Sequence, residues 1–193
     1  MKTSHPQSSS SFRLMALEFR LRDWLRPPAG ILRAAGLRAG MTVLDFGCGP
    51  GGFSLAAARL VGPAGRVYAL DKNPLALEYV RRAAARCRLG NVQPVTGRYM
   101  AETSSVSVDI VLLYDVLHHL DEPGNVFTQL HRVLKLAGRL SVSDHHMQDE
   151  AIMSAVTAGG LFQFSLRNRL TLEFVRLPVG GPRAALPRTG ERA

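Results

Sequence analysis

A glycine-rich segment, MTVLDFGCGPGGFSL at residues 41–55, constrains the fold of this chain more than any other part of the sequence. Four apolar or β-branched residues lead to the carboxylate Asp45, and four glycines follow within the next seven positions. This order is typical of a buried strand that breaks into a loop and then a helix. Glycines permit positive φ angles and let a ligand approach the main chain, while the N–H groups of the next helix point toward it. We therefore predict a small-molecule pocket at the carboxyl end of this strand.

The length of the chain indicates a single domain. Its 193 residues suffice for one full core but are too few for two ordinary domains. The apolar runs are much shorter than the roughly 20 residues of a membrane span, and the N-terminus lacks the apolar segment of a secretory signal. We expect a soluble, cytoplasmic protein with no membrane span.

The charged and cysteine residues argue against several classes of partner. The formal charge of +9 comes mostly from arginines that are spread along the whole chain. Nucleic-acid-binding proteins more often show a basic stripe with interleaved aromatic residues, so a nucleic-acid partner is not expected. Cys48 and Cys87 lack the spacing of a disulfide framework or a metal site, and we expect two free thiols.

Hydrophobic patterning after residue 40 predicts strands that alternate with helices, followed by an antiparallel hairpin. Short returns between strand, helix and strand form right-handed βαβ units. Pro94 cannot donate to a ladder and places its strand at a sheet edge, whereas the apolar strand 108–114 should be central. We predict strands at 41–44, 67–70, 92–96, 108–114 and 139–143, with hairpin strands at 161–166 and 169–177. We predict helices at 53–61, 74–88, 122–136 and 148–157.

Two helices are predicted within residues 12–36. Apolar residues recur at helical spacing over 12–25, and a shorter helix covers 29–35. The first helix carries the only tryptophan, and we interpret it either as a lid over the bound ligand or as a helix packed on the sheet. Residues 1–11 and 178–193 lack patterning and are predicted to be disordered tails.

The glycine loop leaves two kinds of ligand to distinguish. It contains the pattern G-x-G-x-x-G, and the acidic Asp71 follows about 20 residues later, as in nicotinamide dinucleotide-binding proteins. However, Asp45 would repel a pyrophosphate, whereas it suits a ligand that carries an amino group and a sulfonium charge. A dehydrogenase also needs a domain for its hydride acceptor, and this chain leaves no residues for one. The pattern therefore favours a methyl donor over a dinucleotide.

Four segments in order resemble the class I S-adenosylmethionine-dependent methyltransferases, in particular the small-molecule enzymes of the ubiquinone and menaquinone biosynthesis type. They are VLDFGCGPGGF, VYALDKNPLALE, DIVLLYDVLHHLDEP and LHRVLKLAGRLSVSDHH. The resemblance implies an α/β fold with a Rossmann-like, doubly wound, seven-stranded sheet in the order 3-2-1-4-5-7-6, with strand 7 antiparallel. It also implies S-adenosylmethionine as the cofactor and one methyltransferase domain over residues 12–177.

The same resemblance assigns residues to the cofactor. Asp45 and the backbone of the glycine loop would hold the methionine part, and Asp71 would accept hydrogen bonds from both ribose hydroxyls. Related enzymes often have an acid directly after the glycine that follows strand 3, but here Arg98 stands at that position. The implied cofactor-binding residues are Asp45, Gly47, Cys48, Gly49, Asp71, Lys72, Asn73, Met100 and Asp115.

Methyl transfer from sulfonium sulfur is an in-line displacement, and it needs a base only when the acceptor still holds a proton. Histidine can supply such a base near neutral pH. His118 and His119 follow one predicted strand, and Asp144, His145 and His146 follow the next, so these catalytic candidates could meet at the pocket. A structural hydrogen-bonding role for one of the histidines remains open, as does a metal site formed by His119, Asp144 and His145; our prediction includes no metal.

The sequence therefore predicts an S-adenosylmethionine-dependent methyltransferase that acts on a small-molecule substrate, as a monomer or homodimer. One alternative is an enzyme that methylates RNA or a protein, which only the basic charge suggests. Another is a binding module that keeps the cofactor fold without catalysis. The sequence does not identify the acceptor atom.

Overall fold

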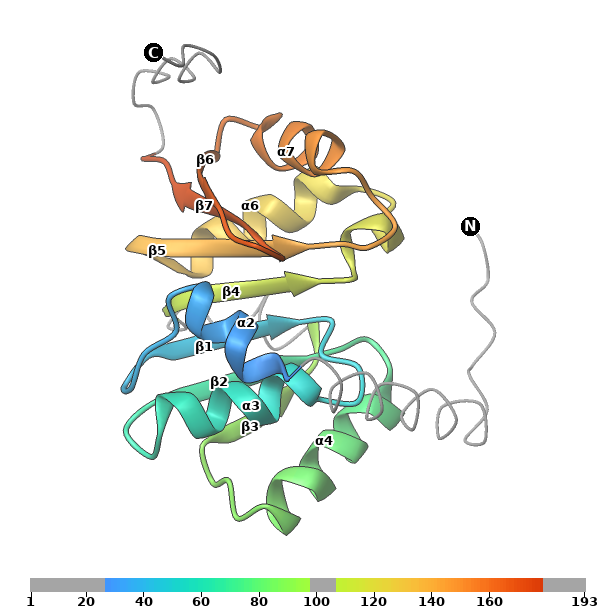
Figure 1. Ribbon diagram of the computed structural model, residues 1–193. Helices are drawn as coiled ribbons and strands as arrows, with labels where there is room; N and C mark the ends of the chain where they lie inside the picture. The colour runs from blue at the N-terminus through green and yellow to red at the C-terminus, as the bar shows by residue number, and fades with distance from the viewer. Residues whose placement is uncertain (1–26, 98–106, 179–193) are drawn as a thin grey trace.

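The computed structural model describes residues 27–97 and 107–178. Seven strands form one mixed sheet that lies between two layers of helices (Figure 1). The strands are β1 (Thr42–Phe46), β2 (Arg66–Leu70), β3 (Val92–Val95), β4 (Val108–Tyr114), β5 (Leu134–Ser143), β6 (Phe162–Arg167) and β7 (Leu172–Arg176). The helices are α2 (Pro28–Ala34), α3 (Gly52–Val61), α4 (Pro74–Arg86), α6 (Pro123–Val133) and α7 (Asp149–Thr157), with a short 3-10 helix η1 (Leu117–His119).

The strand order is β3-β2-β1-β4-β5-β7-β6. Strands β1 to β5 pair in parallel, and β7 pairs antiparallel with both β5 and β6. This confirms the α/β fold and the sheet order that the family resemblance implied. Among the described strands, the one that contains Pro94 is last in the order and pairs with β2, so its predicted edge position is also correct.

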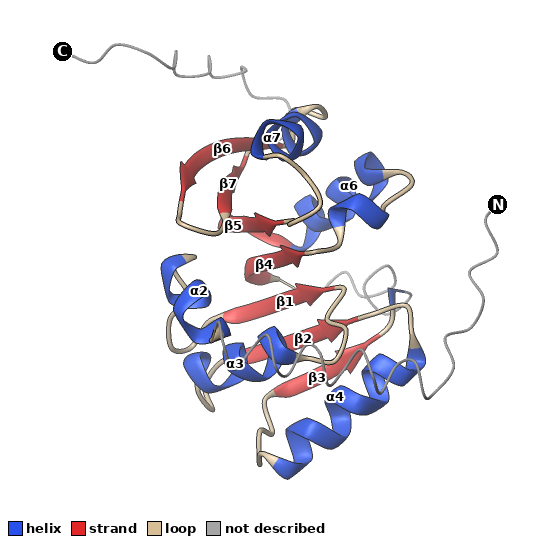
Figure 2. Ribbon diagram, turned by 45° about the vertical axis from the view of Figure 1, so that its right-hand side comes forward, coloured by secondary structure: helices blue, strands red, loops and turns tan. Residues whose placement is uncertain are grey.

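The helices cover the two faces of the sheet in separate groups (Figure 2). On one face, α2 and α3 bury residues such as Leu32 and Ala57 against Val43 and Ile110 of the central strands. On the other face, α6 and α7 pack apolar side chains against β4, β5 and β7, with Phe174 fully buried. Burial of both faces explains why β4 is almost entirely apolar.

The boundary between α6 and β5 differs from the prediction. The helix was expected to reach residue 136, but it ends at Val133, and β5 begins at Leu134 rather than at residue 139. Leu134 pairs with Val108, and the register then shifts before the next pair, Ile110 with Arg139. A bulge of this kind inserts unpaired residues that hide the period-two pattern of a strand.

The terminal hairpin is antiparallel as predicted, but its turn lies later in the chain. The prediction separated the strands at residues 167–168, whereas β6 extends to Arg167 and the turn occupies residues 168–171. The Asn168 N–H donates to Thr171 O at 2.8 Å and closes this turn. The polar residues at 167–168 were therefore not sufficient to predict the position of the turn.

Several predictions fall on residues outside the described ranges. They concern the tails at 1–11 and 179–193, the helix at 12–25 with its lid interpretation, and Met100. Within the described residues, no helix has the length and apolar character that a membrane crossing requires.

Candidate active site

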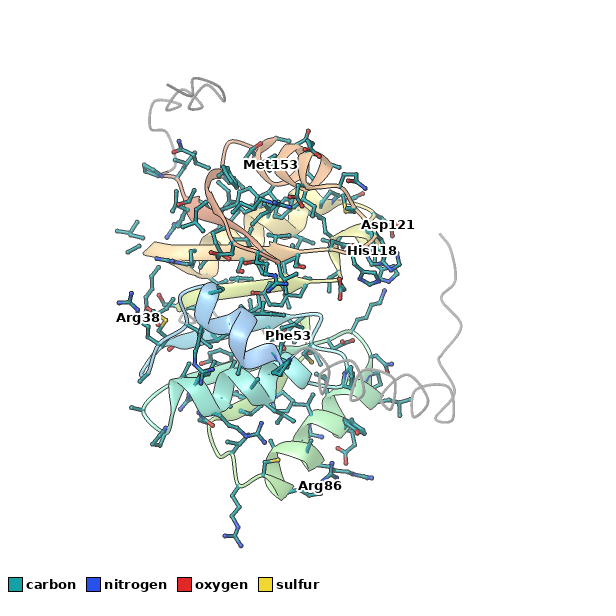
Figure 3. All side chains as sticks on the ribbon, viewed as in Figure 1. Arg38, Phe53, Arg86, His118, Asp121 and Met153 are labelled. Carbon is teal, nitrogen blue, oxygen red and sulfur yellow. The ribbon has the colours of Figure 1, made fainter. Side chains whose placement is uncertain are left out.

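Four neighbouring parallel strands carry an aspartate at the same edge of the sheet. These residues are Asp45 in β1, Asp71 after β2, Asp115 after β4 and Asp144 after β5. The strand arrows of β1, β2, β4 and β5 in Figure 1 point toward this side of the sheet. We call the side formed by the carboxyl ends of these strands the carboxyl edge, and the side formed by their amino ends the amino edge. In open α/β sheets, ligands bind in the crevice outside the carboxyl ends of the strands. Figure 3 shows His118 and Asp121 on this side of the molecule.

The glycine loop bends at three left-handed residues, Gly47 (φ 78°), Gly49 (φ 50°) and Gly51 (φ 85°). A Cβ atom on Gly47 would collide with Val116, and one on Gly51 would lie 2.7 Å from Val80 Cγ2. A Cβ on Gly49 would meet no atom within 4 Å. The loop is therefore closely packed on two sides while its backbone at Gly49 faces open space, which fits the approach of a cofactor.

Asp45 is buried at the base of this loop. The sequence placed it after the strand, but it lies within β1 because the pairing with β2 and β4 continues through it. Its carboxylate accepts a 2.5 Å hydrogen bond from the Ser54 hydroxyl, in the first turn of α3. Burial raises the pKa of Asp45 to about 6, with a smaller contribution from the Asp71 charge, while the bond from Ser54 opposes the shift.

The Asp45 pKa leads to a prediction about pH. An ionised Asp45 would attract the cationic cofactor expected from the sequence, so affinity for S-adenosylmethionine should increase as the pH is raised through about 6. Replacing Ser54 with alanine removes the hydrogen bond that favours ionisation and should move this increase to higher pH. Calorimetric titrations over a pH series measure the midpoint.

Ser141→Ala is the matched control, because Ser141 is also a buried serine but bonds to Tyr114 and Glu173 instead. Its midpoint should equal that of the wild-type protein. An unchanged midpoint in Ser54→Ala would contradict the assignment of the pH dependence to Asp45.

Asp71 is held in place by main-chain donors on both sides. The Gly49 N–H donates to its Oδ2 at 2.9 Å, and the Asn73 N–H donates to its Oδ1 at 2.8 Å. A carboxylate has about four acceptor positions, so both oxygens can still accept hydrogen bonds from a pair of hydroxyls. Asp71 thus joins the glycine loop to the start of α4 and fits the ribose of the expected cofactor.

Cys48, another of the predicted cofactor-binding residues, lies in the glycine loop with its side chain buried. The Cys48 side chain is buried with Ala69, Leu77 and Val80, and burial raises the pKa of its thiol. Its N–H donates to Leu70 O at 2.8 Å. A direct role of Cys48 toward the cofactor stays a prediction.

Asn73 is the N-cap of α4, where its side chain accepts a 2.9 Å hydrogen bond from the Leu75 N–H. Lys72 is exposed, and its charge contributes to lowering the pKa of His119. That influence places Lys72 in the electrostatic range of the histidines, a relation that the sequence did not suggest. The contacts of Lys72 and Asn73 with adenine stay predictions.

His118 and Asp144 form a close pair across the ends of β4 and β5. The His118 Nδ1 atom lies 2.9 Å from Oδ1 and 2.8 Å from Oδ2 of Asp144. The His118 main-chain N–H also donates to this carboxylate at 3.1 Å, as does that of His146. The Asp144 side chain is 0% exposed and that of His118 is 20% exposed. The two residues are therefore fixed in position and still partly accessible through the imidazole.

A second pair, His145 with Asp115, lies beside the first. The His145 Nδ1 atom is 2.7 Å from Asp115 Oδ1, and the His145 N–H donates to the same oxygen at 3.2 Å. Asp115 has a left-handed φ of 54°, a conformation that costs energy for any residue with a Cβ. The His145 side chain is 65% exposed, so this pair is much more open to solvent than the first.

The two pairs belong to one row of imidazoles, which we call the histidine row. Its ring centroids are separated by 3.8 Å between His119 and His118, 4.3 Å between His118 and His146, and 3.9 Å between His146 and His145. The expected convergence of the two His-His segments is thus correct. His146, the fourth of the candidate histidines, lies between the two pairs.

The surroundings of the histidine row shift two of its pKa values. Burial lowers the pKa of His119, and the neighbouring His118 and Lys72 act in the same direction. Burial acts to raise the pKa of Asp144, but the hydrogen bonds from His118 and His146 outweigh it and hold this pKa below its ordinary value. Asp144 is therefore ionised at neutral pH, in contact with an imidazole.

The alternative metal site finds no support in the described part of the chain. Within residues 27–97 and 107–178, no three His, Cys, Asp or Glu side chains are arranged to hold a metal ion. His118 and His145 each direct one ring nitrogen to a carboxylate instead.

Comparisons with known proteins agree with this geometry. A family model described as "Methyltransferase domain" matches residues 37–164, which is more than half of the chain. The chain is 28% identical over 152 residues to a ubiquinone biosynthesis O-methyltransferase of Pseudomonas paraeruginosa, covering 79% of this chain and 61% of that protein. It is 33% identical over 111 residues to an arsenite methyltransferase of Halobacterium salinarum, covering 57% of this chain and 28% of that protein.

Among solved structures, a SAM-dependent methyltransferase from Aquifex aeolicus aligns with a TM-score of 0.73 and 22% identity. The alignment covers 87% of this chain and 97% of that one. The curated relatives are longer, and the chain spans less than two thirds of the length of both curated proteins named above.

Proposed function

The chain belongs to the methyltransferase-domain family, and from this premise we propose that it transfers a methyl group from S-adenosylmethionine to an oxygen atom of a small-molecule acceptor. The observation that carries the proposal is the His118–Asp144 pair at the ends of β4 and β5. The family match confirms the predicted class of enzyme and S-adenosylmethionine as its cofactor. The acceptor and the roles of individual residues are proposed here.

The cofactor is proposed to lie across the carboxyl ends of β1, β2 and β4. Asp71, fixed by the N–H groups of Gly49 and Asn73, accepts the two ribose hydroxyls. The glycine loop and the buried Asp45 hold the methionine part, and Asp115 borders it at the end of β4. When bound, the cofactor supplies an electrophilic methyl group on a sulfonium centre.

His118 is proposed as the general base for the acceptor. Asp144 accepts the Nδ1–H of His118 and thereby selects the tautomer in which Nε2 has the lone pair. This nitrogen would take the proton of an acceptor hydroxyl, and Asp144 would stabilise the resulting imidazolium. Asp144 acts through His118 and is therefore a positioning residue.

Oxygen fits this arrangement better than the other acceptor atoms. A hydroxyl is a poor nucleophile until its proton leaves, so a positioned base increases the rate. Lys72 and the histidine row place positive or ionisable groups near the same edge, where they stabilise a developing oxyanion. Among the relatives, the enzyme of Pseudomonas paraeruginosa is named as an O-methyltransferase, which supports an oxygen acceptor.

Product analysis with labelled cofactor tests the proposal. The protein is incubated with methyl-labelled S-adenosylmethionine and, separately, a catechol, arsenite, an arginine-rich peptide or a transcribed RNA. Label should appear in the catechol. A catechol derivative with both hydroxyls already methylated should accept none. Label in RNA or peptide alone would contradict a small-molecule acceptor. Cofactor binding without labelling of any acceptor would indicate the non-catalytic binding module.

A further inference from the structure

A cavity lies at the amino edge of the sheet, on the far side of β1 and β2 from the histidine row. It has a volume of about 420 Å³ and lies between the end of α3, the start of β2 and the turn that follows α4. Three arginines, Arg59, Arg66 and Arg88, line it, and no acidic residue does. Nothing in the methyl-transfer chemistry uses this cavity.

Among residues 27–97 and 107–178, no carboxylate forms an ion pair with the three arginines. Arg59 donates to Cys87 Sγ at 3.2 Å and to Leu55 O at 3.4 Å. The three guanidinium groups therefore retain donors and positive charge for a ligand.

The surrounding helix ends increase the positive charge of this edge. The last turns of α2, α3, α4 and α6 each contain a basic residue: Arg33, Arg59, Arg86 and Arg132. Figure 3 shows Arg38 on the side opposite to His118 and Arg86 at the end of α4. The carboxyl edge, in contrast, carries the four aspartates described above. Within the part of the chain that the structure describes, these helix ends thus add positive charge to the amino edge.

The end of α3 would normally repel an anion, because the last carbonyl groups of a helix carry partial negative charge. Here the side chain of Asn91, another lining residue, covers two of them. Its amide nitrogen donates to Ala58 O at 2.9 Å and to Gly62 O at 2.8 Å. These two carbonyl oxygens are therefore occupied, which reduces the repulsion of an anion beside the arginines.

Arg88 occupies a backbone position that favours glycine. It follows the C-cap of α4 with a left-handed φ of 54°, and the Leu89 N–H closes the helix end on Ala84 O at 2.9 Å. Glycine adopts this conformation without the steric cost that a Cβ brings. A strained residue is a reason to look for a function of its side chain, and here that side chain lines the cavity.

We propose that this arginine pocket binds the phosphoryl groups of a small anion, at a site separate from the methyl-transfer site. Guanidinium groups bind phosphate oxygens through paired N–H donors, and three of them match a ligand with two linked phosphoryl groups. A small ligand fits better than an RNA substrate, because an RNA held here would lie on the edge opposite to the histidine row. Convergence on one cavity also differs from the extended stripe that a nucleic acid requires.

Calorimetry with inorganic pyrophosphate tests the proposal on the full chain. The wild-type protein should bind it saturably at one site. Arg88→Gly should weaken binding at least about tenfold, the loss expected for charged hydrogen bonds, while its melting temperature stays equal or increases because the helix end is relieved. Arg169→Ala removes an exposed arginine of the β6–β7 connection and should leave binding within about twofold of wild type.

Three results would overturn the proposal. The first is an absence of saturable binding at millimolar pyrophosphate. The second is an equal weakening of binding in both variants, which would reflect net charge alone. The third is displacement of pyrophosphate by a short single-stranded RNA whose binding also requires Arg88. The last result would identify a nucleic-acid phosphate as the occupant. S-adenosylmethionine affinity, measured in the same samples, should be equal in the wild type and in Arg88→Gly.

Discussion

Replacement of His118 with asparagine is expected to lower kcat by about 10²- to 10⁴-fold, the usual contribution of a positioned general base. Asparagine retains an N–H donor near the position of Nδ1 and can keep the contact with Asp144. It has no group that can take a proton from the acceptor. Steady-state kinetics with a methyl-accepting catechol measure the loss, and affinity for S-adenosylmethionine should not change.

The neighbouring pair provides the matched control. His145→Asn changes the same residue type, also paired through Nδ1 with an aspartate, but at an exposed position. It should reduce kcat by less than about tenfold, because the proposal assigns the proton transfer to His118 and a base must lie within reach of the proton that it removes. Equal losses in the two variants would show that neither histidine acts specifically.

The pH profile adds a readout that a purely structural role would not change. In the wild type, kcat should increase with pH as the general base loses its proton. His118→Asn should lack this increase. Asp144→Asn should displace it, because the stabilising carboxylate is lost while the base remains. A profile that is identical in all three proteins would contradict the general-base proposal.

Replacement of Asp71 with alanine should weaken binding of S-adenosylmethionine by at least about 100-fold, since two charged hydrogen bonds to the ribose are worth about 3–6 kcal/mol. The substitution also releases the N–H groups of Gly49 and Asn73, which hold the glycine loop and the start of α4 together. Isothermal titration calorimetry measures the loss directly, without a known acceptor.

Asp121→Ala controls for the loss of one negative charge. Asp121 is exposed near His118 on the same side of the molecule (Figure 3). Its replacement should change affinity by less than about threefold, as expected for a solvated surface charge. If Asp71→Ala bound the cofactor as tightly as Asp121→Ala, the ribose assignment would be wrong. A thermal melt of each variant confirms that the fold is intact.

Much of the fold could be predicted because its signals are local. The glycine segment after β1, Pro94 in β3 and the apolar run of β4 each reflect a backbone requirement within a few residues. The start of β5 was missed because a bulge breaks its alternation between Leu134 and Arg139. The hairpin turn was missed because a contact from Asn168 to Thr171, rather than polarity alone, determines its position.

In the candidate site, too, residues with a local sequence signal could be predicted, whereas contacts between separate elements could not. The position of Asp71 beside the glycine loop could be predicted from its place after the next strand, and its contact with the ribose stays a prediction. The partner of Asp45 was not predicted, although Ser54 lies only nine residues away, because the bond depends on how the loop places α3. A polar residue in the first turn after a glycine loop was the available signal.

The sequence by itself determined the family, the sheet order that the family implies, and the cofactor. This was possible because the residues proposed to hold the cofactor lie in a short, continuous loop and directly after strands. Only the tertiary structure decided that His118 pairs with Asp144, 26 residues away, and that His146 lies between two histidine–aspartate pairs. Only it decided that three arginines from separate elements line one cavity. Such contacts depend on strand register and helix placement, which are set by packing across the whole sheet rather than by neighbours in the chain.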